Sequence, residues 1–514
     1  MVLAQISERA VTDAAIVLLG AGAVLAIVGG LLYGRWRLVG QLALVAALLA
    51  LGAGTAFGAW AWHENRPRDV RGSSTEEFVE RLRPAPPKPK QKKRGPNPLL
   101  VSESWPTYGF DPERTHLAPT EWRLRPPFRG IWKRALGSDI EFPPSIAYGK
   151  LYVAQQKGHF YAINARSGKV HWTKNFDRCV ASSPAIADGI VYQGFMQTNP
   201  CGGHVRTHEG FVIAWDARNG KELWRLQTGA VESSPVVVGR TLYLGSKDRY
   251  VYALQLRGRK RPRVRWKFRA DDEVVAAPAY SQGKIYAVTS NGSVYAIDAR
   301  NGREVWHATS FSRFGGREYF YATPAVAYGR VFAPNADGTV YAYGARTGNL
   351  LWARQVGTYV YTAPAVWRRT VYVGTWDGYF VALDAVTGDV RWRFDAPSTI
   401  GGAPTVLSGI VYFSTCGRCG IGGSRRVELG RRRTFGLNAR NGDVVYTFFD
   451  GKYSPVVSDG RRVYITGRNK VYALIPLVRW QRYQRLKAAE KRRAAKRARD
   501  RSRARTSTSS GTPG

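Results

Sequence analysis

Two long apolar runs open the chain, and they differ in kind from the pattern that follows. Residues 14–33 and 38–61 contain no charged side chain, and a helix needs roughly 20 apolar residues to cross the hydrocarbon core of a membrane. A short Gly-Arg-Trp-Arg sequence at 34–37 separates the two runs. We therefore predict two transmembrane α-helices that form a hairpin over 11–62.

From residue 128 onward, short apolar runs recur in groups of four. The first run of each group ends near a tryptophan, the second contains a proline, the third resembles KLYVA or TVYVG, and the fourth resembles VYAID or FVALD. β-Branched and aromatic residues fill these runs, and Gly, Asn or Asp bounds them, which is typical of strands. Each kind of run occurs eight times, at spacings of 40 to 54 residues. Four strands per repeat of this length indicate a propeller blade, so the predicted fold class is all-β, an eight-bladed β-propeller over 128–476.

An eleven-residue frame links the fourth run of one group to the first run of the next. Its copies share Gly at the seventh position and Trp or Tyr at the last, and they occupy 162–172, 214–224, 296–306, 342–352, 382–392 and 436–446. Between Ala253 and Trp266 the sequence RGRKRP lengthens the frame, and we expect its turn to bulge. A buried indole removes about 150–250 Å² from water. We therefore predict that one aromatic ring per repeat docks each blade on its neighbour: Trp132, Trp172, Trp224, Trp266, Trp306, Trp352, Trp392 and Tyr446.

The frame ALDAVTGDVRW resembles the tryptophan-docking motif of the PQQ-like, or quinoprotein-like, eight-bladed β-propellers, and the resemblance covers about 104–476. It implies that the proline run is innermost and the tryptophan run outermost. It also implies that the run around Trp132 completes the last blade, near 455–475. The family includes dehydrogenases that hold PQQ and Ca²⁺ on the propeller axis. It also includes BamB-like periplasmic propellers, whose role is protein interaction.

The segments that flank the propeller differ from it in composition. Residues 63–98 are rich in Pro and Lys, and we predict an extended, mobile linker. Residues 99–127 include WPTYGFDPERTHLAP, which looks like the segment that leads into the propeller in that family. Residues 477–514 carry thirteen basic and two acidic side chains, and we predict a basic, partly disordered tail.

The net charge is +40, of which +23 lies on 101–476, so the propeller itself favours anionic partners. Arg35 and Arg37 in the hairpin turn favour a cytoplasmic turn, which places both ends of the hairpin outside. Against this, 63–98 holds ten basic and five acidic residues. A short turn is the cleaner signal, because long domains are exported regardless of their charge. We expect a cell-membrane protein with its propeller on the extracytoplasmic side.

Four cysteines offer either disulfides or a metal site. Cys179 and Cys201, together with His204 and His208, match a Cys₂His₂ zinc site in residue type, whereas an exported domain favours disulfides. For Cys416 and Cys419, the alternatives to a small local disulfide are half a zinc knuckle and a redox dithiol. We predict the disulfides Cys179–Cys201 and Cys416–Cys419.

The two faces of the propeller differ in their loops. Connections from the second run to the third and from the fourth to the first are short and share one face, the short-turn face. The others share the opposite face, the elaborated face, with long insertions at 194–210, 308–322 and 414–434. Because function gathers in variable loops on a rigid scaffold, we predict an interaction face there, formed by Arg313, Phe314, Arg317, Tyr319, Arg418, Arg425, Arg426, Arg431, Arg432 and Arg433. On the short-turn face an arginine recurs at one frame position, which we interpret as a solvated turn position: Arg166, Arg218, Arg300, Arg346 and Arg440.

Carboxylates on the elaborated face could hold Ca²⁺, but we expect them to balance nearby arginines: Asp139, Glu141, Glu232, Asp271, Asp272, Glu273 and Glu318. The sequence assigns no catalytic, cofactor-binding or metal-binding residue. We predict a membrane-anchored, exported, non-catalytic scaffold that binds an anionic envelope polymer or an acidic protein partner. The alternatives are a PQQ- and calcium-dependent dehydrogenase and a cytoplasmic-facing binder of nucleic acid or anionic lipid.

Overall fold

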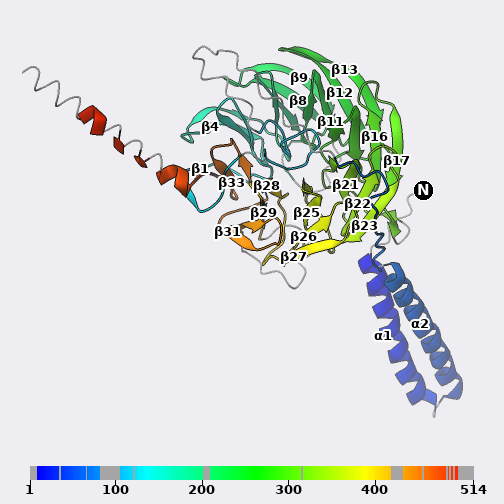
Figure 1. The fold of residues 1–514 in the computed structure, drawn as a ribbon. Coiled ribbons are helices and arrows are strands. Elements are labelled where there is room, and N and C mark those ends of the chain that lie inside the picture. The colour runs from blue at the N-terminus through cyan, green and yellow to red at the C-terminus, as the bar shows by residue number, and fades with distance from the viewer. Residues whose placement is uncertain are drawn as a thin grey trace, which may run out of the picture.

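The computed structural model describes residues 8–33, 36–64, 66–80, 105–119, 122–198, 201, 209–313, 316–417, 432–453 and 456–481, with short pieces at 484–485, 488–489 and 492–495. The two predicted helices are present, as α1 (Glu8–Tyr33) and α2 (Arg37–Glu64). Both are long and apolar enough to cross a membrane. They form a hairpin that leaves the propeller at its rim, near β22 and β23 (Figure 1).

The two helices pack through small residues at every seventh position. Ala15, Gly22 and Gly29 are buried on α1, opposite the buried series Gly40, Ala47, Gly54 and Ala61 on α2. A Cβ atom on Gly22 would lie 2.7 Å from Leu51 Cγ, so the small residues allow close approach of the two backbones. Large apolar side chains such as Leu31 and Leu48 point outward, with 78% and 70% of their surface exposed.

Within the described residues, the propeller consists of eight four-stranded antiparallel sheets, which confirms the predicted eight blades. Blade 1 contains β2 (Ser145–Ala147), β3 (Lys150–Ala154), β4 (His159–Asn164) and β5 (Val170–Asn175). Blade 2 contains β6 (Ala185–Ala187), β7 (Ile190–Phe195), β8 (Glu209–Asp216) and β9 (Glu222–Gly229). Blade 3 contains β10 (Val236–Val238), β11 (Thr241–Gly245), β12 (Tyr250–Arg257) and β13 (Lys260–Arg269). Blade 4 contains β14 (Ala279–Ser281), β15 (Lys284–Val288), β16 (Ser293–Asp298) and β17 (Glu304–Thr309).

A small hairpin, β18 (Ser312–Arg313) with β19 (Gly316–Arg317), precedes blade 5. Blade 5 contains β20 (Ala325–Ala327), β21 (Arg330–Pro334), β22 (Thr339–Gly344) and β23 (Leu350–Gln355). Blade 6 contains β24 (Ala365–Trp367), β25 (Thr370–Gly374), β26 (Tyr379–Asp384) and β27 (Val390–Asp395). Blade 7 contains β28 (Thr405–Leu407), β29 (Ile410–Ser414), β30 (Thr434–Asn438) and β31 (Val444–Phe448). Blade 8 contains β32 (Val457–Ser458), β33 (Val463–Thr466), β34 (Lys470–Pro476) and β1 (Phe128–Ala135).

Blade 8 closes the ring by joining the two ends of the propeller. The first strand, β1, pairs antiparallel with β34, so Trp132 lies opposite Ala473. The predicted closure around Trp132 is therefore confirmed. It leaves no blade with a missing outer strand, and unpaired strand edges invite association with other chains.

The frame residues explain how the blades are joined. Trp306 Nε1 of blade 4 donates to the Ala345 carbonyl of blade 5 at 3.2 Å. A Cβ atom on Gly348 would lie 2.7 Å from that indole ring, so the invariant frame Gly makes room for the neighbouring tryptophan. The same contact recurs at Trp132, Trp172, Trp266 and Trp352.

A tyrosine from the second strand of several blades donates to the same alanine carbonyl as the tryptophan. Tyr286 Oη reaches the Ala345 carbonyl at 2.9 Å, and Tyr152, Tyr243 and Tyr464 act in the same way. In blade 3 the lengthened frame becomes a long hairpin of β12 and β13 with two register shifts. Trp224, which faces this hairpin, has no hydrogen-bond partner for Nε1 among the described residues.

Residues 105–119 cross the propeller axis and close it near the short-turn face. The middle residue of an inner strand donates its amide to this segment in six blades, from Ile146 to the Trp105 carbonyl through to Val406 to the His116 carbonyl. Arg114 is fully buried and donates to the carbonyls of Ser234, Pro235 and Pro278 in blades 3 and 4. Burial lowers the pKa of Arg114 to about 10 and the pKa of His116 to about 3. This segment therefore acts as a plug.

The linker differs from its prediction over 66–80. Val70 forms a bridge with Ala353 of β23, and the amide of Val79 donates to the Tyr328 carbonyl. We call residues 69–80 the strap. Acidic side chains at Asp69, Glu77 and Glu80 each contact an arginine of blades 5 and 6, and these contacts hold a segment that composition alone describes as mobile. Residues 81–98 of the predicted linker lie outside the described residues.

Candidate interaction site on the elaborated face

The disulfide between Cys179 and Cys201 lies on the elaborated face and joins the connection after β5 to the loop after β7. This pairing confirms the prediction and removes both thiolates from the zinc site that was considered. His204 and His208 lie outside the described residues. Cys416 is also disulfide-bonded, and its predicted partner Cys419 lies outside the described residues.

The predicted interaction residues fall into three groups: one near β19, one before β30, and one whose side chains lie outside the described residues. Arg317 lies on β19, Tyr319 follows it, and Arg432 and Arg433 precede β30. Arg433 Cζ stands 5.2 Å from the ring centroid of Phe449, which is 75% exposed. The backbone of Arg313 forms part of β18, but its side chain lies outside the described residues, as do Phe314, Arg418, Arg425, Arg426 and Arg431.

A repeated position surrounds the axis on this face, and the sequence reasoning missed it. It is the fourth residue before the first residue of each inner strand. In blade order the occupants are Glu141, Ala181, Glu232, Val275, Tyr321, Tyr361, Gly401 and Tyr453. We call this set the axial ring. Aligning the repeats on their prolines would have revealed seven of the eight positions, because the ring residue stands three residues before the proline in blades 1 to 7 and two residues before it in blade 8.

Aromatic side chains form one side of the axial ring. The rings of Tyr321 and Tyr361 stack with centroids 4.4 Å apart. Trp376, from the turn between β25 and β26, lies 5.6 Å from Tyr361 and 4.4 Å from Tyr359. Tyr319 extends the cluster through a hydrogen bond of 2.7 Å between its hydroxyl and that of Tyr359. One predicted interaction residue therefore belongs to a larger aromatic surface.

Carboxylates form the other side of the axial ring. Glu232 accepts a hydrogen bond from the Tyr321 hydroxyl and pairs with Lys247 at 2.8 Å. Burial, followed by the charge of Glu232, raises the pKa of Glu141 to about 7. Burial, followed by the charges of Glu141 and Glu232, also raises the pKa of Tyr361. The ring thus combines stacked tyrosines with two carboxyl groups, one of which holds its proton more tightly than usual.

The dehydrogenases that this fold resembles hold PQQ and Ca²⁺ on the axis, and the described carboxylates do not fit a Ca²⁺ site. No group of three or more His, Cys, Asp or Glu residues that could hold a metal ion occurs in the described part of the chain. Asp139 pairs with Lys452 and Arg468, and Asp272 pairs with Arg249. Because Ca²⁺ requires six to eight oxygen ligands, carboxylates held by cationic side chains make a poor donor set.

A family model described as the outer membrane protein assembly factor BamB matches the chain. It matches residues 121–263, 208–358 and 336–508. The chain is 26% identical to BamB of Yersinia pestis over 173 residues, which cover 30% of this chain and 40% of that protein. It is 25% identical to BamB of Vibrio cholerae over 247 residues, which cover 37% of this chain and 64% of that protein. The chain therefore spans less than two thirds of either relative.

Dehydrogenases also resemble the chain. A lanthanide-dependent methanol dehydrogenase of Methylacidiphilum fumariolicum is 35% identical over 98 residues, 16% of each chain. Among solved structures, BamB from Moraxella catarrhalis has a TM-score of 0.53 at 15% identity and covers 68% of this chain and 99% of its own. A quinohemoprotein alcohol dehydrogenase from Pseudomonas putida has a TM-score of 0.58 at 13% identity and covers 73% and 80%. At these identities the solved structures show a shared fold alone.

Proposed function

Because this chain belongs to the family of the outer membrane protein assembly factor BamB, we propose that it is a membrane-anchored scaffold that binds proteins through its elaborated face. The observation that carries this proposal is the surface of half-buried arginines and aromatic rings on the loops of a closed propeller, as at Arg433 beside the exposed ring of Phe449. Aromatic and arginine side chains are the residues enriched in protein interfaces.

We propose that the propeller lies on the extracytoplasmic side. Arg35 and Arg37 in the hairpin turn support a cytoplasmic turn. The disulfide Cys179–Cys201 supports an oxidising compartment.

We propose that the scaffold is non-catalytic. The carboxylates of the elaborated face are paired with lysine or arginine at Asp139, Glu232 and Asp272, which supports a structural role for them. Because some of the relatives are dehydrogenases, oxidation of a substrate is the alternative function that the experiment must test.

The test places a photo-crosslinking residue at Phe449 of the full chain in native membranes, with Val264 on the outer strand of blade 3 as the matched control. Val264 is 44% exposed and lies away from the elaborated face. We expect a defined protein adduct from position 449 and none from position 264. Equal labelling from both positions would contradict the proposal, as would dye reduction by the purified chain that depends on added PQQ and Ca²⁺. A reporter fused after residue 476 tests the orientation separately.

A further inference from the structure

The strap shows how the short-turn face binds an extended chain. It runs along β23 and then over the turns of blades 5 and 6, where the amide of Gly72 donates to the Thr387 carbonyl. The Phe78 ring stacks on Tyr328 at 5.5 Å, and the guanidinium groups of Arg330 and Arg369 lie 5.5 and 5.0 Å from that ring. The bound segment is therefore extended and anchored by one aromatic residue.

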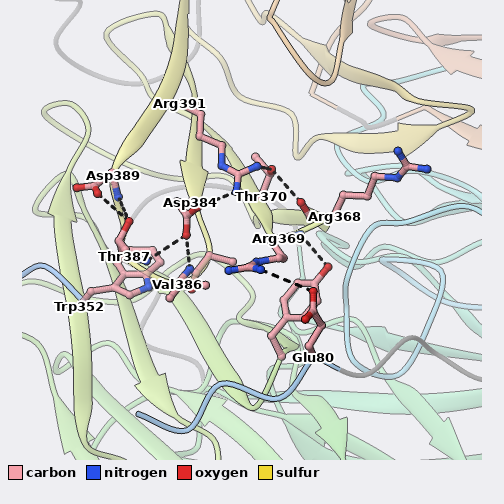
Figure 2. Close-up of polar contacts among 12 residues, drawn as sticks. Glu80, Trp352, Arg368, Arg369, Thr370, Asp384, Val386, Thr387, Asp389 and Arg391 are labelled. Atoms are coloured by element: carbon pink, nitrogen blue, oxygen red, sulfur yellow. Dashed lines mark hydrogen bonds and ion pairs between the residues drawn. The ribbon is translucent and has the colours of Figure 1, made fainter. Parts of the chain in front are cut away.

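Charge complementarity holds the strap in place. Asp69 pairs with Arg354 at 2.7 Å, Glu77 with Arg346 at 3.7 Å, and Glu80 with Arg369 at 3.7 Å. Figure 2 shows the last pair beside the turn that carries Asp384, Val386 and Thr387. Arg330 is fully buried and donates to the carbonyls of Ser73 and Glu76. An acidic segment therefore neutralises a set of arginines between two blades.

The equivalent groove between blades 3 and 4 is open. Its volume is about 600 Å³, and Thr241 and Gln255 line it at the positions that Arg330 and Gly344 hold in blade 5. On the other wall, Ala299 and Arg300 stand where Ala385 and Val386 stand in blade 6. The repeat thus places an open groove between blades 3 and 4 at the position that the strap occupies between blades 5 and 6, with different side chains on its walls.

The open groove is strongly basic. Arg240, Arg265, Lys284 and Arg300 line it, with Asp298 as the acidic member of the lining. Asp298 accepts hydrogen bonds from the amides of Arg300 and Asn301. Among the described residues, none of the four cations forms an ion pair within 4.0 Å, whereas the arginines under the strap do. Tyr243 and Tyr280, stacked at 6.3 Å, add an aromatic surface.

We propose that the groove between blades 3 and 4 binds an extended, acidic segment of a partner protein that carries an aromatic residue. This site lies on the face opposite the proposed scaffold surface and is independent of it. The chain's own remaining segments are unsuited to the groove, because 81–98 holds seven basic residues and no acidic one, and 477–514 holds thirteen basic and two acidic. Like charges repel at the short distances that such a groove imposes.

The experiment uses the full chain in detergent and a fluorescent peptide with the strap sequence DVRGSSTEEFVE as the acidic probe. Fluorescence anisotropy reports binding to wild type, to Arg240→Glu/Arg300→Glu, and to the control Arg261→Glu/Arg263→Glu. All four arginines are exposed, and the control pair lies on blade 3 outside the groove, so the two variants have the same net charge. Thermal unfolding of each variant confirms that the propeller remains folded.

We expect saturable binding that the groove variant weakens roughly tenfold and the control leaves within about twofold, because paired charges act locally and are screened over about 8 Å. Replacing the peptide phenylalanine by alanine should weaken binding as well. Equal loss in both variants, or no saturable binding, would overturn the proposal. Concentration-dependent dimerisation that requires both Arg240 and the acidic strap residues would also overturn it, because the occupant would then be a second copy of the chain.

Discussion

At the residue scale, Trp306 shows why the frame repeats. Its indole donates to Ala345 and covers Gly348 of the next blade. We expect Trp306→Ala to lower the free energy of unfolding by about 3–5 kcal/mol, because it leaves a cavity between two blades. The neighbouring Val305 is 44% exposed, so Val305→Ala should change the free energy of unfolding by at most about 0.5 kcal/mol. Chemical denaturation monitored by tryptophan fluorescence measures both, and equal stability of the two variants would refute the docking role.

Glu141 of the axial ring makes the stability of the folded chain depend on pH. Its pKa is raised to about 7 in the folded chain against an ordinary value of 4.5, so the folded chain retains a proton that the unfolded chain has lost. The resulting stabilisation is complete below about pH 4.5 and is lost as the pH rises through about 7.

We therefore expect Glu141→Gln to gain stability relative to wild type, by about 2 kcal/mol, between about pH 5 and pH 8. Urea denaturation at both pH values measures the difference. Glu304→Gln, at an exposed position on β17, is the control. If the free energies of unfolding of wild type and Glu141→Gln differ by the same amount at both pH values, Glu141 does not hold the proton.

At the scale of elements, the strap joins the membrane hairpin to the propeller. Its backbone amides at Val70, Gly72 and Val79 donate to blades 5 and 6. We expect the double variant Glu77→Gln/Phe78→Ala to lose the ion pair with Arg346 and the ring contact with Tyr328, and to release 69–80 from the surface. Hydrogen exchange of these amides should accelerate by about tenfold or more, since local opening then becomes less costly.

Thr75→Ala is the control for the strap, because the Thr75 hydroxyl shares a hydrogen bond of 2.7 Å with the Ser73 hydroxyl of the same segment. Unchanged protection of 69–80 in the double variant would mean that the backbone bridge to Ala353 alone holds the strap. Faster exchange across the entire propeller would instead indicate a general loss of stability.

At the scale of the whole molecule, excess positive charge resides on the propeller as well as on the tail. We expect neutralisation of Arg431, Arg432 and Arg433 to reduce retention of the protein on isolated envelope by severalfold at physiological salt. Salt screens diffuse charge over short distances, whereas direct arginine contacts persist. Deletion of 482–514 is the comparison, because it preserves the docked turn in which Arg479 donates to the Gly460 carbonyl. If only the tail deletion reduces retention, the elaborated face does not bind the envelope.

The sequence predicts regular features well and single contacts poorly. Gly at the seventh frame position and Trp at the eleventh are local requirements of a turn and an interblade contact, so they recur and can be recognised. The axial ring is different, because Glu232 and Tyr321 come from blades 3 and 5 and meet only when the ring closes. The strap escaped prediction for a similar reason: Glu77 and Arg346 are 269 residues apart, and composition averages over such specific pairs.

The sequence by itself determined the two apolar helices, the strand order within each blade, the number of blades and the disulfide Cys179–Cys201. The helices and the number of blades follow from hydrophobic periodicity and from the repetition of one frame. The strand order follows from the family resemblance that this frame carries, and the disulfide follows from the expected export of the domain. The tertiary structure decided what lies on the axis and between the blades. Arg114 donates hydrogen bonds to carbonyls of blades 3 and 4. The strap fills the groove between blades 5 and 6, and the equivalent groove between blades 3 and 4 is open. Those outcomes depend on which distant charges and rings meet when the propeller closes, and no local pattern encodes them.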